Sequence, residues 1–348
     1  MANMNKRTVS WICASLVIVI LAFGGYYWWH LKQTGKPEKM TGVRFSTVPF
    51  IGSAPLFVAK KNGYFKEQGL DVTFTFNPGG WMSLKDLFEG KADIATVAEL
   101  PIVYSAFDKK KYADFERGDF CIIGDVIYSQ AIQQVVARKD RGINSPSDFK
   151  GKRVGVFKGT TLDFFMDAFF TDHRIKYSDV EIVDMDVFKL TDAIGKGDLD
   201  LIFTWQPHVA RAQKILGDNA VTFQSRGKYT TCWLIVVMKE YAEKNPEVLE
   251  GFLMAIAKAE KFIRKHPEQA KDIHAEIGKT DREIVATLWD AVDFDLSLGR
   301  ATITTMEDEA KWLIRKGMYK GASLPDFLDY ICIDPLQKVK PGSIQIIR

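Results

Sequence analysis

Strand-like and helix-like patterns alternate along the chain after residue 42. Hydrophobic and β-branched positions form short stretches typical of strands at 43–47, 70–76 and 93–97. Each stretch is followed by a loop of Gly, Pro or polar residues and then by a helical pattern, at 54–61, at 81–89 and from 99 onward. Strands that alternate with helices predict an α/β fold with a parallel sheet and right-handed crossovers.

The ends of these predicted strands indicate a small-molecule site, because ligands of open parallel sheets bind outside the carboxyl ends of the strands. The first loop contains Phe50 and Ser53, and Ser53 is expected to be the N-cap of the next helix. The second loop contains Gly80 and Trp81. The third begins with Glu99.

A second set of strands follows at 120–126, 131–138, 153–157 and 180–184. The sequence Gly197-Asp198 then enters another strand in the same way as Gly90 does earlier, which fits two α/β lobes. Between the strand at 153–157 and a helix at 162–170 lie Lys158, Gly159, Thr160 and Thr161. Free N–H groups at a helix N-terminus, approached closely through a Gly, favour an anion site. The alternative is an ordinary turn with a Thr as N-cap.

Two further strand ends supply candidate binding residues. Trp205 is expected to wall the pocket, and Gln206 can donate and accept hydrogen bonds without adding charge. The alternative is a buried Trp with a capping Gln. Thr231 and Trp233 precede the strand predicted at 234–238, and Trp81, Trp205 and Trp233 together would suit a flat or alkyl ligand.

Glu99 leaves the charge of the ligand open. No Arg lies at a predicted strand end, so a bidentate clamp for an anion is not indicated. If Glu99 points into the cleft, the ligand is zwitterionic or a heterocycle, because a buried carboxylate repels a plain anion. If Glu99 only complements the dipole of its helix, nothing follows from it about the ligand. Independently of Glu99, the backbone donors around 159–161, with Ser53 and Thr231, suit an anionic head group.

The N-terminus predicts export of the chain. Residues 11–29 carry no charge, are long enough for most of a bilayer core, and follow Lys6 and Arg7. The aromatic run at 26–29 favours an uncleaved signal anchor over a cleaved signal peptide. We therefore predict a cytoplasmic segment 1–10, an anchor 11–29, a linker 30–42, and a body outside the cytoplasm.

Composition narrows the class of protein. A chain of 348 residues exceeds the usual reach of one core and predicts two lobes. With 47% hydrophobic residues and a net charge of +3 it is typical of a globular protein. Since no Lys/Arg stripe with interleaved aromatics is present, nucleic-acid binding is not expected.

The cysteines do not form a clear framework. Cys13 lies in the apolar N-terminal run, and Cys121, Cys232 and Cys332 are isolated and odd in number. We expect free buried thiols, with one bridge between two of these three as the alternative. No spacing indicates a metal site, and no cofactor is expected.

Three short motifs of the chain carry a resemblance: Asn62-Gly63-Tyr64-Phe65-Lys66-Glu67-Gln68-Gly69-Leu70-Asp71-Val72, Gly90-Lys91-Ala92-Asp93-Ile94-Ala95 and Trp205-Gln206-Pro207. They resemble motifs of one family, the periplasmic solute-binding proteins of ABC transporters of the nitrate, taurine, aliphatic-sulfonate and thiamine-pyrimidine-precursor type. The resemblance implies a two-lobed type II binding-protein fold, with 43–128 and 238–348 in lobe 1 and 129–237 in lobe 2. It also implies a small ligand held in a cleft that closes about a hinge, and partnership with an ABC permease and its ATPase. The resemblance is specific for the family and not for the ligand, and the residues discussed above favour an anionic or zwitterionic/heterocyclic one.

Two other functions stay open. An enzyme on the same fold, similar to a desulfinase or a thiamine-pyrimidine synthase, would need a reactive group, and Cys232 and His208 are the candidates. A membrane-tethered sensor would need a cytoplasmic signalling segment, but only about ten residues precede the apolar run. We predict a binding protein without catalytic residues.

Overall fold

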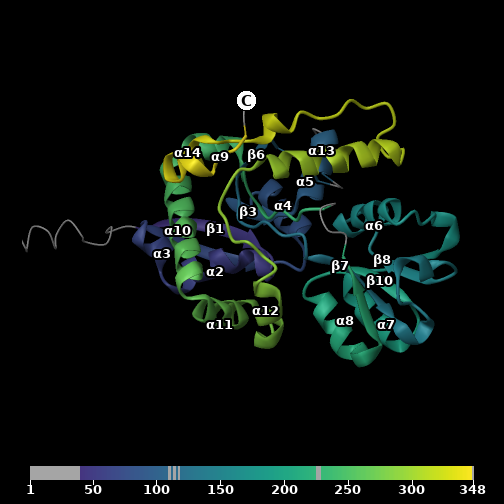
Figure 1. Ribbon diagram of the computed structural model, residues 1–348. Coiled ribbons are helices and arrows are strands. Elements are labelled where there is room, and N and C mark those ends of the chain that lie inside the picture. The colour runs from purple at the N-terminus through teal and green to yellow at the C-terminus, as the bar shows by residue number, and fades with distance from the viewer. Residues whose placement is uncertain (1–39, 109–110, 113–114, 117, 225–228, 347–348) are drawn as a thin grey trace, which may run out of the picture. The chain divides into compact units, whose positions relative to one another are not determined.

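The structure is a computed structural model that describes residues 40–108, 111–112, 115–116, 118–224 and 229–346. The predicted anchor at 11–29 lies outside these ranges. Within them, no helix has both the length and the hydrophobicity needed to traverse a bilayer. The chain from Thr41 onward is one compact unit that contains two five-stranded sheets (Figure 1).

The first sheet has the strand order β2-β1-β3-β12-β6. Strand β1 pairs in parallel with β2 and β3, whereas β12 runs antiparallel to both β3 and β6. The central strand β3 and the edge strand β6 are both buried along their whole length, so both faces of the sheet are covered at these strands. The bounds are β1 Thr41–Thr47, β2 Leu70–Phe76, β3 Ile94–Val97, β6 Phe120–Asp125 and β12 Leu234–Met238.

Helices from both ends of the described chain pack around the first sheet. Helix α10 contacts α2, α3, α11 and α14, and α13 contacts α5. The early helices are α2 Ala54–Lys61, α3 Tyr64–Glu67, α4 Gly80–Phe88 and α5 Glu99–Phe107. The late helices are α9 Lys239–Lys244, α10 Pro246–Lys265, α11 Pro267–Gly278, α12 Arg282–Trp289, α13 Arg300–Arg315 and α14 Asp334–Val339. A two-stranded sheet, β4 Lys111–Tyr112 and β5 Phe115–Glu116, follows α5.

The second sheet has the order β11-β7-β10-β8-β9. Strands β10, β8 and β9 are parallel, and β7 pairs antiparallel with β10 and β11. The strands are β7 Gln133–Arg138, β8 Arg153–Val156, β9 Glu181–Asp184, β10 Leu201–Trp205 and β11 Ala220–Phe223. The helices of this half are α6 Thr161–Asp172, α7 Val187–Lys196 and α8 His208–Leu216 (Figure 1).

The chain passes between the two sheets twice, after β6 and before β12. The two crossings pair with each other, since the Thr231 N–H donates to the Ser129 carbonyl at 2.8 Å. Because β12 belongs to the first sheet, the second crossing ends before Leu234, a few residues earlier than the boundary at 237 that the sequence predicts. The halves also touch where Lys316, after α13, pairs with Asp167 of α6 at 3.0 Å.

Two sequence predictions of local structure differ from the structure. The sequence pattern over 281–316 predicts helix throughout, but the chain leaves α12 at Trp289 and re-enters a helix only at Arg300. Ser53 occupies the N-cap position of α2 but makes no capping hydrogen bond. Its hydroxyl donates to the Val48 carbonyl at 2.8 Å instead, which ties the first strand-end loop together.

The expectation of free thiols is wrong for two of the cysteines. Cys121 of β6 and Cys332 near the C-terminus form a disulfide with a Cα–Cα distance of 5.7 Å. Cys232 is free and buried. The bridge joins residues 211 positions apart, so it fastens the C-terminal segment to the centre of the chain.

Candidate functional site

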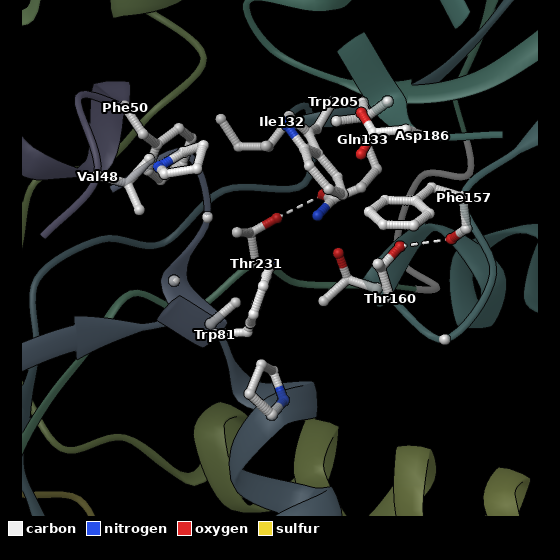
Figure 2. Close-up of a pocket in the computed structure, with 18 of the residues that line it drawn as sticks. Val48, Phe50, Trp81, Ile132, Gln133, Phe157, Thr160, Asp186, Trp205 and Thr231 are labelled. Carbon is white, nitrogen blue, oxygen red and sulfur yellow. Dashed lines mark hydrogen bonds between the residues drawn. The ribbon is translucent and has the colours of Figure 1, made fainter. Parts of the chain in front are cut away.

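A pocket of about 410 Å³ lies where strands of both sheets end. Its lining comes from the loops after β1, β2 and β3 on one side and from the loops after β8, β9 and β10 on the other. Both crossings contribute as well, through Gln133 at the start of β7 and through Thr231 and Trp233. Figure 2 shows side chains from both sheets converging on this space. The strand-end rule therefore locates a pocket of the size of small-ligand sites.

Ten of the thirteen residues selected from the sequence line this pocket. The aromatic members are Phe50, Trp81, Trp205 and Trp233. The others are Gly80, Lys158, Gly159, Thr160, Thr161 and Thr231. Their contact with a ligand stays a prediction.

Three selected residues do not line this pocket, because each is engaged by other groups of the chain. The Ser53 hydroxyl accepts a hydrogen bond from Nε1 of Trp233 at 3.2 Å. The Gln206 side chain accepts from the Ala210 N–H at 3.2 Å, and so caps α8, which is the alternative the sequence left open. Glu99 is fully buried and binds the second crossing.

Aromatic rings form much of the pocket wall. Trp233 is only 5% exposed and is held by Ser53 and by an edge contact with Phe50, whose ring centroid lies 5.0 Å away. Trp81 at the start of α4 is 45% exposed, so its ring is free to cover a ligand. A rigid buried indole and a more exposed one in the same lining favour a ligand with a flat or apolar body.

Gly80 lets α4 begin directly against β3. A Cβ at this position would lie 3.1 Å from the Val97 Cα and 3.1 Å from the ring of Trp233. We expect Gly80→Ala to push the first turn of α4 away from β3 and to lower ligand affinity roughly 10-fold, with a loss of about 1 kcal/mol in stability. Calorimetric titration of Gly80→Ala tests this. Gly42→Ala is the control, since a Cβ there meets nothing within 4 Å. Equal affinities for the two variants would contradict the prediction.

The loop between β8 and α6, predicted as an anion site, uses its own carboxylates as partners. The Lys158 N–H donates to Asp184 at 3.1 Å, and the Gly159 N–H donates to Asp163 at 3.2 Å. Thr160 caps α6, because its Oγ1 accepts from the Leu162 N–H at 3.3 Å and donates to the Phe157 carbonyl at 2.7 Å. The turn with a Thr cap is therefore present, and several donors expected for an anion are occupied.

Helices α4 to α7 each begin at the pocket and differ in charge. Helix α6 has Asp163 in its first turn, α5 has Glu99, and α7 is capped by Asp186. Helix α4 has no acidic residue in its first turn or at its N-cap. Its start at Gly80 is thus the helix end that has no acidic side chain of its own to offset the positive dipole.

Gln133 and Thr231 form the polar part of the pocket. The Thr231 hydroxyl donates to Oε1 of Gln133 at 2.6 Å, a bond that Figure 2 shows between the two crossings. Gln133 is 4% exposed, so its amide is fixed by burial as well as by this bond. These side chains can orient a polar group of a ligand without supplying charge.

A buried acidic layer lies behind the pocket wall. Oε1 of Glu99 accepts from the Tyr229 hydroxyl, and Oε2 accepts from the Cys232 N–H at 3.2 Å. Burial raises the pKa of Glu99 to about 8, although backbone N–H groups of Glu99 and Cys232 oppose the shift. Burial also raises the pKa of Asp125 to about 6, against hydrogen bonds such as that from the Trp233 N–H at 2.9 Å. On the neighbouring helix α13, burial raises the pKa of Glu309 as well.

The two candidates for an enzymatic group are far from a catalytic arrangement. Cys232 does not line the pocket, and burial raises the pKa of its thiol, which disfavours a nucleophilic thiolate. His208 lies in a separate hollow beside Phe188 and Arg211, and burial lowers its pKa to about 4. Among the described residues, no group of three or more His, Cys, Asp or Glu side chains could hold a metal ion.

Sequence reasoning missed several lining residues that now matter. Asp186 follows the end of β9, so applying the strand-end rule to that strand would have found it. Tyr104 lies one turn after Pro101 on α5 and could be found from helical spacing. Gln133 opens β7 next to a second glutamine, Gln134, and only its place in the fold brings it rather than Gln134 to the pocket.

Comparison with known proteins gives one family. The family model described as NMT1/THI5 like matches residues 51–270, more than half of the chain. The chain is 27% identical over 227 residues to a taurine-binding periplasmic protein of Escherichia coli strain K12. The alignment covers 64% of this chain and 67% of that protein.

Solved structures share the fold. The periplasmic aliphatic sulphonate binding protein SsuA from Escherichia coli aligns with a TM-score of 0.69 at 17% identity, over 83% of this chain and 97% of that one. A desulfurization enzyme, DSZB, aligns with a TM-score of 0.62 at 14% identity, over 86% of this chain and 99% of that one. The α/β fold with two sheets is therefore that of periplasmic binding proteins, and it also occurs in an enzyme.

Proposed function

The chain belongs to the NMT1/THI5-like family, and on that premise we propose that it is an extracytoplasmic solute-binding protein. It captures a small nutrient in the pocket between the two sheets and delivers it to an ABC importer. The observation that carries the proposal is the pocket of about 410 Å³ at the strand ends of both sheets.

The two crossings support a closing motion on the ligand. The pocket receives residues from both sheets, and Gln133, Thr231 and Trp233 come from the crossings themselves. Rotation about paired crossings is a known way for two-lobed proteins to close on a ligand. The closed form would then be the one that the permease recognises.

The proposed binding residues are the ten selected residues of the lining, together with Gln133, Asp186 and Tyr104. Sulfonate and taurine are the ligands that the names of the similar proteins give. The sequence alone favours an anionic or zwitterionic/heterocyclic nutrient. An apolar wall with few polar groups favours a ligand whose body is an alkyl chain or a ring.

We also propose that residues 11–29 hold the protein at the outer face of the inner membrane. This rests on the sequence, namely an uncharged run after Lys6 and Arg7. Mass spectrometry of the mature N-terminus and fractionation of cells test it. We expect the chain to keep Met1–Trp29 and to be found in the membrane fraction. A soluble chain that begins near Tyr26 would show instead that the apolar run is a cleaved signal peptide.

An enzyme on this fold is the alternative, and the buried thiol of Cys232 and the remote His208 argue against it. Absence of turnover of any bound ligand by the purified chain is the expected result. A product that forms in the presence of wild type but not of Cys232→Ala would favour the enzyme instead.

Thermal denaturation of residues 41–348 with a ligand panel tests the proposed function. The panel holds nitrate, taurine, alkyl sulfonates, small carboxylates, amidines and aminopyrimidines. A ligand at 100 times its dissociation constant should add about 2.7 kcal/mol to the free energy of unfolding. The same ligand should lose most of its effect on Trp205→Ala. A chain that binds nothing, and whose deletion leaves uptake of the whole panel unchanged, would refute the proposal.

A further inference from the structure

The pocket carries very little positive charge. Among the described residues that line it, only Lys158 and Asp186 have charged side chains, and both are exposed at its edge. No Arg is part of this lining. An anion bound here would thus have one mobile ammonium as its ionic partner, beside a carboxylate that repels it.

Two backbone N–H donors on the Lys158 side of the pocket already have hydrogen-bond acceptors within the chain. The N–H groups of Lys158 and Gly159 donate to Asp184 and Asp163, so two carboxylates occupy the positions that an anionic ligand would need. Asp163 also offsets the dipole of α6. The start of α4 offers N–H donors, and these can equally bind an uncharged hydroxyl or carbonyl oxygen of a ligand.

The charge behind the opposite wall is negative too. Asp125 accepts from the N–H of Trp233, a residue of the lining, at 2.9 Å. With its pKa raised by burial only to about 6, Asp125 is mostly ionised at neutral pH. Asp186 in the lining and Asp125, Asp163 and Asp184 behind it thus outnumber two ammonium groups, that of Lys158 and that of Lys316, which acts on Asp163. This balance of charge favours a negative field in the pocket.

The remaining wall consists largely of aromatic rings. Trp81, Tyr104, Phe157, Phe188, Trp205 and Trp233 all contribute to the lining. The faces of such rings carry negative charge density and attract organic cations. Asp186 uses Oδ1 to cap α7 by accepting from the Phe188 N–H at 2.9 Å. Its other oxygen has no hydrogen bond within the described part of the chain, so it can pair with a cation.

From this arrangement we propose that the ligand is an organic cation, an amine with an alkyl or aromatic body, whose charged group lies among the aromatic rings beside Asp186. The inference rests on the proposed function and specifies its ligand class. Figure 2 shows Asp186 on the same side of the pocket as Trp205, Phe157 and Gln133. Oε1 of Gln133 is a further acceptor for an ammonium N–H.

Matched ligands that differ only in charge test the proposal. The full-length chain, purified in detergent, is titrated at pH 7 with the ammonium, the alcohol and the sulfonate of three skeletons, 2-phenylethyl, cyclohexylmethyl and n-hexyl. Calorimetry and tryptophan fluorescence measure the affinities. For at least one skeleton, the ammonium should bind at least 10-fold more tightly than its sulfonate.

Two variants locate the charge that is responsible. Asp186→Asn keeps an oxygen to cap α7 and should weaken the ammonium about 10-fold while it leaves the alcohol unchanged. Lys158→Met should strengthen the ammonium by a few fold, whereas an anionic ligand would lose affinity. Unchanged melting temperatures without ligand confirm that both variants are folded.

The outcomes separate this inference from the proposed function. Sulfonates that bind as tightly as the ammonium ions, or more tightly, would overturn the inference and leave a solute-binding protein for anions. Asp186→Asn with full affinity for the ammonium would overturn it as well. If no ligand of the series and none of the wider panel binds, both the inference and the proposed function fail.

Discussion

Replacement of both Cys121 and Cys332 by alanine is expected to lower the free energy of unfolding by about 2 to 4 kcal/mol. The bridge closes a loop of 211 residues, so its loss frees a large part of the unfolded chain. In the folded chain the bridge acts beside a backbone hydrogen bond, from the Cys332 N–H to the Ile122 carbonyl at 2.9 Å, and this bond is all that the alanine variant keeps of the pair. Urea denaturation of the double variant and of the wild type measures the difference.

Cys232→Ala is the matched control for this experiment, since Cys232 is a free thiol in the same core. Its denaturation midpoint should fall on addition of a reductant as much as that of the wild type, whereas the double variant should not respond to the reductant at all. A wild type whose midpoint is the same with and without reductant would show that the bridge contributes nothing. A structural disulfide also suits a chain that matures outside the cytoplasm.

The bridge illustrates a limit of sequence reasoning. Three cysteines far apart in the chain allow three pairings, and nothing in their spacing selects one. The choice depends on β6 lying beside the segment that follows Ile331, which is a long-range contact of the folded chain. Local patterns cannot predict such a contact.

The strand ends were predictable because they depend on local chemistry. Pro78, Gly79 and Gly80 end β2 and begin α4 within a residue of the expected boundary, and Thr160 caps α6. The pocket lies where strands of both sheets end, so the loops that follow these strands come together there. The chain positions that carry polar groups to this edge could therefore be selected before the structure was known.

The roles of individual side chains were less predictable. Ser53, Glu99 and Gln206 all lie near strand ends, but each is bound by a partner from the fold, Trp233, Tyr229 and Ala210 respectively. The antiparallel entry of β12 between β3 and β6 brings Tyr229 and Trp233 into place. The partners of Ser53 and Glu99 lie more than a hundred positions away in the chain. The sequence alone therefore could not predict which way these two side chains point.

Glu99→Gln is expected to change the pH dependence of stability. Burial raises the pKa of Glu99 from 4.5 to about 8 in the folded chain, so the folded state holds this proton more tightly than the unfolded state. The resulting stability is fully present below pH 4.5 and is lost as the pH rises through about 8. Each unit of raised pKa corresponds to about 1.4 kcal/mol, so the loss for the wild type is a few kcal/mol.

The glutamine variant should not show this loss, because its amide is neutral throughout. Its carbonyl oxygen can accept from the Cys232 N–H, and its NH₂ group can donate to the Tyr229 oxygen, so both partners of Glu99 are kept. Asp125 titrates in both proteins, so its contribution to the difference between their free energies of unfolding cancels to first order. Denaturant unfolding should therefore show that the free energy of unfolding of Glu99→Gln, relative to that of the wild type, is higher at pH 9 than at pH 5.

Ionisation of Glu99 should also affect ligand binding in the pocket. Tyr229 and Cys232 flank the lining residue Thr231, and Trp233 follows directly. Ionised Glu99 still accepts both hydrogen bonds, but its buried charge costs free energy, which opening of this crossing to water relieves. Ionisation is therefore expected to loosen the segment that holds two pocket residues. Wild-type affinity for any ligand that does not itself titrate should fall above pH 8, and that of Glu99→Gln should stay flat. Glu240→Gln is the control, because Glu240 is exposed and paired with Lys244. If the difference in stability between wild type and Glu99→Gln is the same at pH 5 and pH 9, Glu99 does not titrate in this window and its carboxyl is not the group that couples the crossing to pH.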